Sequence, residues 1–332
     1  MQRVLVPLAI APAHPPINCP TRDFAGQSMG TSWSVLFVDT SGRGGHDWQG
    51  EIQAQLDRVV AQMSHWQADS SLGIYNRASA GSWHVLPPEF HSVMQCALQV
   101  AALSDGAYDP TAGALVNLWG FGPGGAYAAA DFLPPSATAV GAAMADCGWQ
   151  RVSLDADRRM FQPGGLQLDL SSIAKGYAVD LVADYLHASG VDHFLVEVGG
   201  ELRGAGMKAD GQPWWVSLEA PVASTAPTIA ALHGLSIATS GDYRRCFEHA
   251  GQRYAHTLDP RSGYPLATGV ASVTVLHREC MQADAWSTAM TVMGVEAGLA
   301  HAEAHALAVH FVRHEDGEYR EYMSSAFAGM LQ

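Results

Sequence analysis

The chain has 332 residues, of which 48% are hydrophobic and 15% are charged, and its formal net charge is −14. This apolar content is enough for a large buried core, and an acidic chain without a Lys/Arg cluster argues against nucleic-acid binding. The five cysteines are scattered without a C-x-x-C pair, which argues against a disulfide framework or a zinc site, and no apolar run of about 18 residues could cross a membrane.

Residues 1–24 are rich in proline and are expected to form an irregular tail ahead of one domain at 25–332. The apolar residues 4–11 are interrupted by Pro7, so this stretch is short for a signal peptide. The flanks of Cys19 do not resemble a lipoprotein cleavage site. We therefore expect a cytoplasmic protein, with a periplasmic or membrane-associated location as the alternative.

Hydrophobic periodicity predicts a strand and then helices in the first part of the chain. Residues 32–39 are β-branched and aromatic and end at a glycine-rich turn, which is typical of a strand. Apolar residues recur at helical spacing from about Trp48, and a second helix is predicted at roughly 88–104. A Gly/Pro/Ala-rich loop over 121–138 leads into a short helix at about 136–146.

The second part of the chain is predicted to be richer in strands. Two short strands are expected within 151–168, followed by a helix that ends at Gly190. In "HFLVEVGGELRGAG" a strand is predicted to run into Gly-rich turns. Further strands are predicted in "PWWVSLEAP", "LSIATSGDY", "RYAHTLDP" and "ASVTVLHR". A helix at 282–298 and a hairpin around Asp316 follow. Because helices and hairpins do not alternate as βαβ units, we expect an α+β fold with mixed, largely antiparallel sheets.

The stretch "QADAWSTAM" places one acid and one hydroxyl in a helix that is otherwise small and apolar. Asp284 and Thr288 are four residues apart and therefore share one helix face. One interpretation is that Asp284 caps its own helix near the start and Thr288 bonds back to a carbonyl. The other is a site for a hard cation such as Mg²⁺, which prefers carboxylate and hydroxyl oxygens.

The stretch "LDLSSIAKG" combines an acid at a strand end with a helix start. Asp169 ends the apolar strand, and Ser171 and Ser172 stand where the helix begins. A helix N-terminus offers free N–H groups to an anion, and Lys175 could reach a phosphate from one turn inside. The alternative is an ordinary helix cap with Lys175 in solvent.

Three other stretches could contribute to a site. In "AHTLDPRSGYP", His256 could act as a general base, or it could be a surface-loop histidine with Asp259 serving the turn. Tyr108 and Trp119 could form a slot for a flat ring, or they could be core aromatics. Met29 stands between glycines, where the backbone could approach a ligand closely.

Seven stretches taken together, in chain order, resemble the ApbE family of FAD:protein FMN transferases. They are "MGTSW", "MSHWQADSSLGIYN", "GAYDPTAGALVNLWGFG", "LDLSSIAKGYAVD", "VEVGGELRGAG", "HTLDPRSGYP" and "ADAWSTAMTVMG". The resemblance runs from about Gly26 to the C-terminus. It implies an ApbE-like, T-fold-related architecture and a Mg²⁺-dependent enzyme. Such an enzyme transfers the FMN half of FAD to a Thr or Ser hydroxyl of a target flavoprotein and releases AMP.

The resemblance also implies roles for particular residues. His256 would be the catalytic base. The FAD-binding residues would be Met29, Trp66, Ala107, Tyr108, Asp109, Asp169, Lys175 and Leu258. The metal would be held by Ser172, Asp284, Ser287 and Thr288, with the Ala174 carbonyl as an alternative to Ser172. Trp66 stands where the family commonly has Tyr, and Ser262 where it commonly has Thr. The usual lipoprotein leader of the family looks absent.

Two other functions remain compatible with these residues. A Mg²⁺-dependent FAD pyrophosphatase would use water in place of the acceptor hydroxyl and give FMN and AMP. A non-enzymatic FAD-binding protein would release no AMP. Asp284, Thr288 and His256 together favour an enzyme, because binding alone requires none of them.

Overall fold

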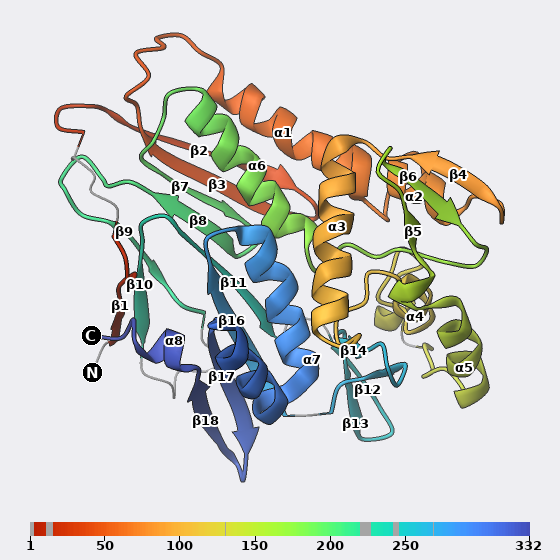
Figure 1. Ribbon diagram of the computed structural model, residues 1–332. Helices are drawn as coiled ribbons and strands as arrows, with labels where there is room; N and C mark the ends of the chain where they lie inside the picture. Colours follow the sequence, from red (N-terminus) through yellow and green to blue (C-terminus); the bar gives the residue numbers. More distant parts are fainter. Residues whose placement is uncertain (1–2, 11–15, 130, 220–226, 242–245, 268) are drawn as a thin grey trace.

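A computed structural model describes residues 3–10, 16–129, 131–219, 227–241, 246–267 and 269–332. Its centre is an eight-stranded sheet in which every neighbouring pair of strands is antiparallel (Figure 1). In spatial order the strands are β18 (Glu318–Met323), β17 (Ala308–Glu315), β16 (Val270–His277), β11 (Leu235–Gly241), β8 (Glu201–Ala205), β7 (Phe194–Val198), β3 (Thr31–Val38) and β2 (Thr21–Ser28).

Side-chain alternation along the central strands gives the sheet two buried faces. In β3, Trp33, Val35 and Phe37 belong to the main hydrophobic core, while Val38 belongs to a second core. Successive side chains of a strand point to opposite faces, so this pattern places one core on each side of the sheet. Both faces of the sheet are therefore covered.

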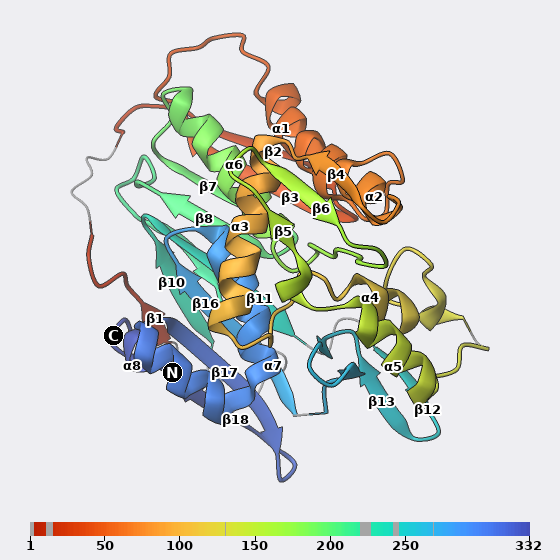
Figure 2. The same cartoon turned by 45° about the vertical axis from the view of Figure 1, so that its right-hand side comes forward.

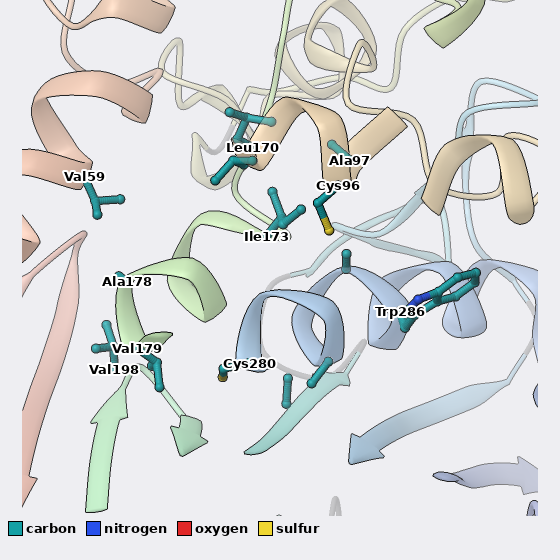
Figure 3. Close-up of a cluster of buried hydrophobic side chains, with 14 of the residues drawn as sticks. Val59, Cys96, Ala97, Leu170, Ile173, Ala178, Val179, Val198, Cys280 and Trp286 are labelled. Carbon is teal, nitrogen blue, oxygen red and sulfur yellow. The ribbon is translucent and has the colours of Figure 1, made fainter. Parts of the chain in front are cut away.

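Helices cover one face of the sheet and enclose the main core. Helices α1 (Trp48–Met63), α6 (Ala174–Ala188) and α7 (Cys280–His305) pack on the strands, and α3 (Pro88–Leu103) packs on α7. Figure 3 shows Cys96 of α3, Ile173, Ala178 and Val179 at α6, and Cys280 and Trp286 of α7 in one buried cluster. This cluster fixes the positions of the first turns of α6 and α7.

The opposite face is covered by a small sheet and the two ends of the chain. The small sheet has the order β1 (Arg3–Leu5), β10 (Thr228–Leu232) and β9 (Trp214–Ser217), and α8 (Ser325–Ala328) lies beside it. The expectation of an irregular tail over residues 1–24 does not hold where strands form, at Arg3–Leu5 in β1 and from Thr21 in β2. Leu5 is 1% exposed, and the Val6 N–H donates to the Met330 carbonyl at 2.9 Å. These partners lie more than 200 residues away, so no local pattern indicates them.

The remaining elements gather at one end of the molecule in Figures 1 and 2. A third small core surrounds Trp119 and includes Leu115, Phe121, Val140 and Leu258. The elements are α2 (Ser71–Asn76), β4 (Ser82–Val85), α4 (Gly113–Leu118), η1 (Ala126–Ala128), α5 (Ala137–Asp146), η2 (Trp149–Arg151), β5 (Ser153–Leu154), β6 (Arg159–Gln162), β12 (Cys246–His249), β13 (Gln252–Ala255), β14 (Leu258–Asp259) and β15 (Tyr264–Pro265).

The structure confirms the α+β class and most of the predicted elements. It differs at three places. Gly199 and Gly200 make a tight turn, so "HFLVEVGGELRGAG" forms the hairpin β7–β8 and not one strand. The predicted strand "RYAHTLDP" is two strands, β13 and β14, with His256 between them. Helix α7 extends to His305, with a break in helical geometry at Gly294. The predicted strand ends at 220–221 and 242–243 lie outside the described residues.

The described helices include none that is both long enough and apolar enough to cross a membrane. Each of the five cysteines is a free thiol, as the scattered spacing predicted. The cellular location expected from the sequence stays a prediction.

Candidate functional site

The first turns of α6 and α7 meet over the sheet, and Asp284 lies at this contact. Asp284 is 4% exposed, and its carboxylate accepts a hydrogen bond from the Gly176 N–H at 2.9 Å. Asp284 is in the second turn of α7, which begins at Cys280. The interpretation that Asp284 caps its own helix is therefore wrong. Asp284 binds a free N–H in the first turn of α6 instead.

Burial and the neighbouring donors act in opposite directions on the pKa of the Asp284 carboxyl group. Burial raises the pKa of Asp284, while the Lys175 ammonium and the Gly176 N–H act to lower it. Lys175 also forms an ion pair with the buried carboxylate of Glu201 on β8. Lys175 thus interacts with two buried acids, Asp284 and Glu201.

Three hydroxyl groups lie close together one turn further along α7. The Ser240 hydroxyl on β11 is 2.8 Å from the Ser287 hydroxyl and 3.1 Å from the Thr288 hydroxyl. Ser287 is buried and also donates to the Asp284 carbonyl at 2.8 Å. Thr288 is the more accessible of the two residues on α7. Sequence reasoning did not single out Ser240, because nothing local to "IATSG" indicates that it faces α7.

Tyr108 lies beside Ser172 in the interior of the site. Burial raises the pKa of Tyr108 strongly, and the Ser172 hydroxyl opposes that rise, while the nearby carboxylates of Asp284 and Asp169 add to it. Among the described residues, no hydrogen bond of standard geometry reaches the Tyr108 hydroxyl. An unsatisfied buried hydroxyl is uncommon, and it indicates a place where a bound molecule or ion could supply the partner.

Asp169 connects this interior to an open cavity. It is 3.6 Å from His65 Nδ1 and accepts a hydrogen bond from the Ser171 N–H at 2.7 Å. A cavity of about 170 Å³ is lined by Asp169, His65 and neighbouring polar residues. The ring of Trp66, which is 56% exposed, lies 5.4 Å from the His65 ring. Trp66 and Asp169, predicted as separate FAD-binding residues, are therefore joined through His65.

Met29 is in the two-residue turn of the β2–β3 hairpin. Met29 and Gly30 both have positive φ, at 52° and 72°, which fits a tight hairpin turn. A methionine in the left-handed region is uncommon, and such strain is often found at ligand sites. Thr31, which follows Gly30, packs closely against Gly199. A Cβ added to Gly199 would lie 2.8 Å from the Thr31 side chain and 3.4 Å from the Lys175 side chain. This turn is thus near Lys175.

The predicted residues Ala107 and Asp109 are in a buried turn before α4. Asp109 accepts hydrogen bonds from the Thr111 N–H at 2.8 Å, the Thr111 hydroxyl at 2.6 Å and the Trp149 N–H at 3.1 Å. Burial raises the pKa of Asp109, and these bonds oppose the rise. Its carboxylate therefore fixes the loop that carries Tyr108.

His256 and Leu258 are placed by the small core around Trp119. His256 stands between β13 and β14, and Leu258 is the first residue of β14. The His256 ring makes an edge contact with Phe121 at 6.3 Å, and Leu258 is part of the small core around Trp119.

The residues around Asp284 fit a Mg²⁺ ion. No group of three or more His, Cys, Asp or Glu side chains suited to a metal occurs in the described part of the chain. Mg²⁺ does not need one, because it binds one or two carboxylates, keeps several waters and takes substrate phosphates. Within the described residues the Asp284 carboxylate accepts a single hydrogen bond, from Gly176, so it keeps capacity for a cation.

Gly176 allows the two helices to approach closely, which makes it a test of the contact. A Cβ on Gly176 would overlap the Cys280 carbonyl oxygen and lie 2.7 Å from the Asp284 Cβ. We expect Gly176→Ala to lower the free energy of unfolding by about 2 kcal/mol through overpacking, measured by urea denaturation.

The matched control for this variant is Gly141→Ala, in helix α5. A Cβ on Gly141 meets nothing within 4 Å. Alanine favours a helix over glycine by up to about 1 kcal/mol, so this control should be neutral or stabilising. Equal effects of the two substitutions would contradict the close contact.

The chain matches the ApbE family model over residues 29–311. It is 37% identical over 310 residues to the FAD:protein FMN transferase of Vibrio cholerae, which covers 92% of each chain. It is 34% identical over 324 residues to the protein of the same name from Haemophilus influenzae, covering 93% of this chain and 91% of the relative.

Solved structures are also similar to this chain. The crystal structure of the Pseudomonas stutzeri flavinyl transferase ApbE in its apo form superposes with a TM-score of 0.86 at 41% identity. The superposition covers 94% of this chain and 97% of the Pseudomonas chain. The fold and the sequence thus agree on one family.

Proposed function

Because the chain belongs to the ApbE family, it is an enzyme, and we propose that it transfers the FMN half of FAD to an acceptor protein. We further propose that the transfer depends on Mg²⁺, that the acceptor group is a Thr or Ser hydroxyl of a flavoprotein, and that AMP is released. The names of the relatives support the transfer itself. The finer points depend on the residues of the site.

One observation carries the metal-dependent part of the proposal. The buried carboxylate of Asp284 lies at the first turn of α6 with spare capacity for a cation, and the more accessible hydroxyl of Thr288 lies one turn away on α7. Asp284 and Thr288 would hold Mg²⁺ together with Ser172 or the Ala174 carbonyl. Ser287 would keep Ser240 and Thr288 in place. When bound, Mg²⁺ neutralises the charge of the FAD pyrophosphate and of the leaving phosphate.

The residues of this chain would perform the remaining work of positioning and proton transfer. The acceptor hydroxyl oxygen forms a bond to the FMN phosphorus, the P–O bond to AMP breaks, and AMP leaves with the bonding electrons. His256 takes the hydroxyl proton as general base. Lys175 and the free N–H groups at the start of α6 attract the pyrophosphate. Phosphoryl transfer requires chiefly such positioning and charge stabilisation.

Two regions would hold the two ends of FAD. The isoalloxazine ring would lie near Met29, Trp66 and the buried Tyr108. Asp169 connects Trp66, through His65, to the interior where Ser172 and Tyr108 lie. Ala107 and Asp109 fix the turn that carries Tyr108, and Leu258 belongs to the same part of the molecule as His256.

Mass spectrometry of an acceptor protein tests the proposal directly. The acceptor should carry a motif of the type D-x-x-(S/T)-(G/S)-A-(S/T) and be incubated with this protein, FAD and Mg²⁺. We expect a mass gain equal to one FMN on the Thr or Ser, one AMP per modified acceptor, and no reaction in EDTA. Stoichiometric AMP without any acceptor would instead show a pyrophosphatase. FAD binding without AMP under every condition would show a carrier protein.

A further inference from the structure

Helices α6 and α7 are joined by two matched contacts that run in opposite directions. Gly176 and Asp180 are four residues apart on α6, and Cys280 and Asp284 are four residues apart on α7. In the first contact, the Gly176 N–H donates to Asp284 at 2.9 Å. In the second, Asp180 accepts hydrogen bonds from the Cys280 N–H at 3.0 Å and the Met281 N–H at 2.8 Å. Each helix therefore binds free N–H groups at the start of the other.

Asp180 replaces the cap that α7 lacks in its own sequence. The residue before α7, Glu279, makes no side-chain hydrogen bond to the helix start. The first N–H groups of a helix need acceptors, and a carboxylate there is favoured by the helix dipole. Because these acceptors come from α6, the position of α7 along its own axis depends on Asp180.

A strand residue holds Asp180 in turn. The Arg203 guanidinium on β8 donates to Asp180 at 2.7 Å. Arg203 and Glu201 are two residues apart on β8 and face the same side, where Glu201 pairs with Lys175. The strand therefore anchors α6 through two ion pairs of opposite polarity. Asp180 is buried, and two backbone N–H groups and the Arg203 guanidinium offset the cost of burying its charge.

We infer that Asp180, held by Arg203, is a positioning residue for Asp284. Asp180 fixes the first turn of α7. Asp284 follows Cys280 by four residues and therefore lies on the same helix face. If the first turn were not fixed, the Asp284 carboxylate would be displaced from the start of α6. The inference rests on the proposed role of Asp284 as the cation ligand. It assigns to Asp180 and Arg203 a function in metal affinity.

Metal binding by the full-length, metal-free protein tests this inference, with Mn²⁺ as the probe and free Mn²⁺ followed by electron paramagnetic resonance. We expect Asp180→Asn to weaken Mn²⁺ binding by about tenfold or more, since residues that orient metal ligands commonly have effects of that size. The matched control is Asp184→Asn. Asp184 is one turn further along α6, lies 3.6 Å from Arg203 and is 70% exposed. Among the described residues Asp184 makes no hydrogen bond or ion pair with α7, so its loss should leave Mn²⁺ affinity unchanged.

A second variant keeps the test decisive if Asp180→Asn does not fold. Arg203→Lys keeps a cation beside Asp180 but removes the planar fork of donors. It should weaken Mn²⁺ binding in the same direction, by a smaller factor. A role in stability alone would lower the melting temperature and leave Mn²⁺ affinity at the wild-type value in both variants, which would overturn the inference. A wild-type protein that binds no Mn²⁺ would also overturn it.

These results are separable from the proposed function. Mn²⁺ binding is measured without FAD or an acceptor, so it decides the role of Asp180 even if no FMN transfer is found. Conversely, FMN transfer by the wild-type protein together with unchanged Mn²⁺ affinity in Asp180→Asn would leave the proposed function intact and remove only this inference.

Discussion

Replacing Asp284 with alanine is expected to abolish FMN transfer and to leave a folded protein. A metal ion supplies several kcal/mol of charge stabilisation in reactions of this type. Loss of about 4 kcal/mol corresponds to a rate about a thousandfold lower. The rate is measured by mass spectrometry of the acceptor at saturating FAD and Mg²⁺, and circular dichroism checks the fold.

Glu296→Ala is the control for this substitution. Glu296 is also on α7 but is 79% exposed and pairs with Arg313. Its removal takes the same charge from the same helix and should leave the transfer rate unchanged. Full activity of Asp284→Ala in EDTA-treated buffer would show that the metal is not held at Asp284.

Replacing Asp284 should have the opposite effect on the stability of the metal-free protein from its effect on FMN transfer. Burial raises the pKa of Asp284 above its ordinary value, so the folded protein binds its proton more tightly than the unfolded chain does. The protonated form of Asp284 therefore favours the fold at low pH, and this contribution is lost as the pH rises through the folded-state pKa. Asp284→Asn should raise the melting temperature of the metal-free protein at pH 7, and this gain should shrink as the pH falls. A lower melting temperature at pH 7 would indicate that Asp284 is structural.

Replacing His256 with asparagine is expected to slow FMN transfer by about 10²–10⁴-fold, which is the usual contribution of a general base. FAD binding, followed by flavin fluorescence, should remain near the wild-type affinity, because the residues around Trp66 and Asp169 are unchanged. The rate constant for transfer at saturating FAD is the quantity to compare.

His249→Asn is the control for the His256 variant. His249 is on β12, in the hairpin that precedes His256. It should transfer FMN at the wild-type rate. A wild-type rate for His256→Asn would remove His256 as the base. Loss of FAD binding in that variant would instead place His256 in the substrate pocket.

Local sequence patterns were sufficient to predict the types of most elements. The helix from Trp48 and the strand of Trp33, Val35 and Phe37 are visible because apolar residues repeat at the period of each structure. The combination of seven motifs also indicated the ApbE family, which the comparisons confirmed. The acid and hydroxyl of α7 could be chosen as candidates because their spacing places them on one helix face.

Only the tertiary structure decided which residues meet. The sequence left open whether Asp284 capped its own helix, because the Gly176 N–H that it binds is 108 residues away. Ser240, Asp180 and Glu201 were not candidates, since each acts through a partner on another element. The N-terminal strand was missed for the same reason, as Leu5 is buried by residues from the far end of the chain. Periodicity reports how one segment is arranged, whereas contacts between distant segments depend on how the whole core packs.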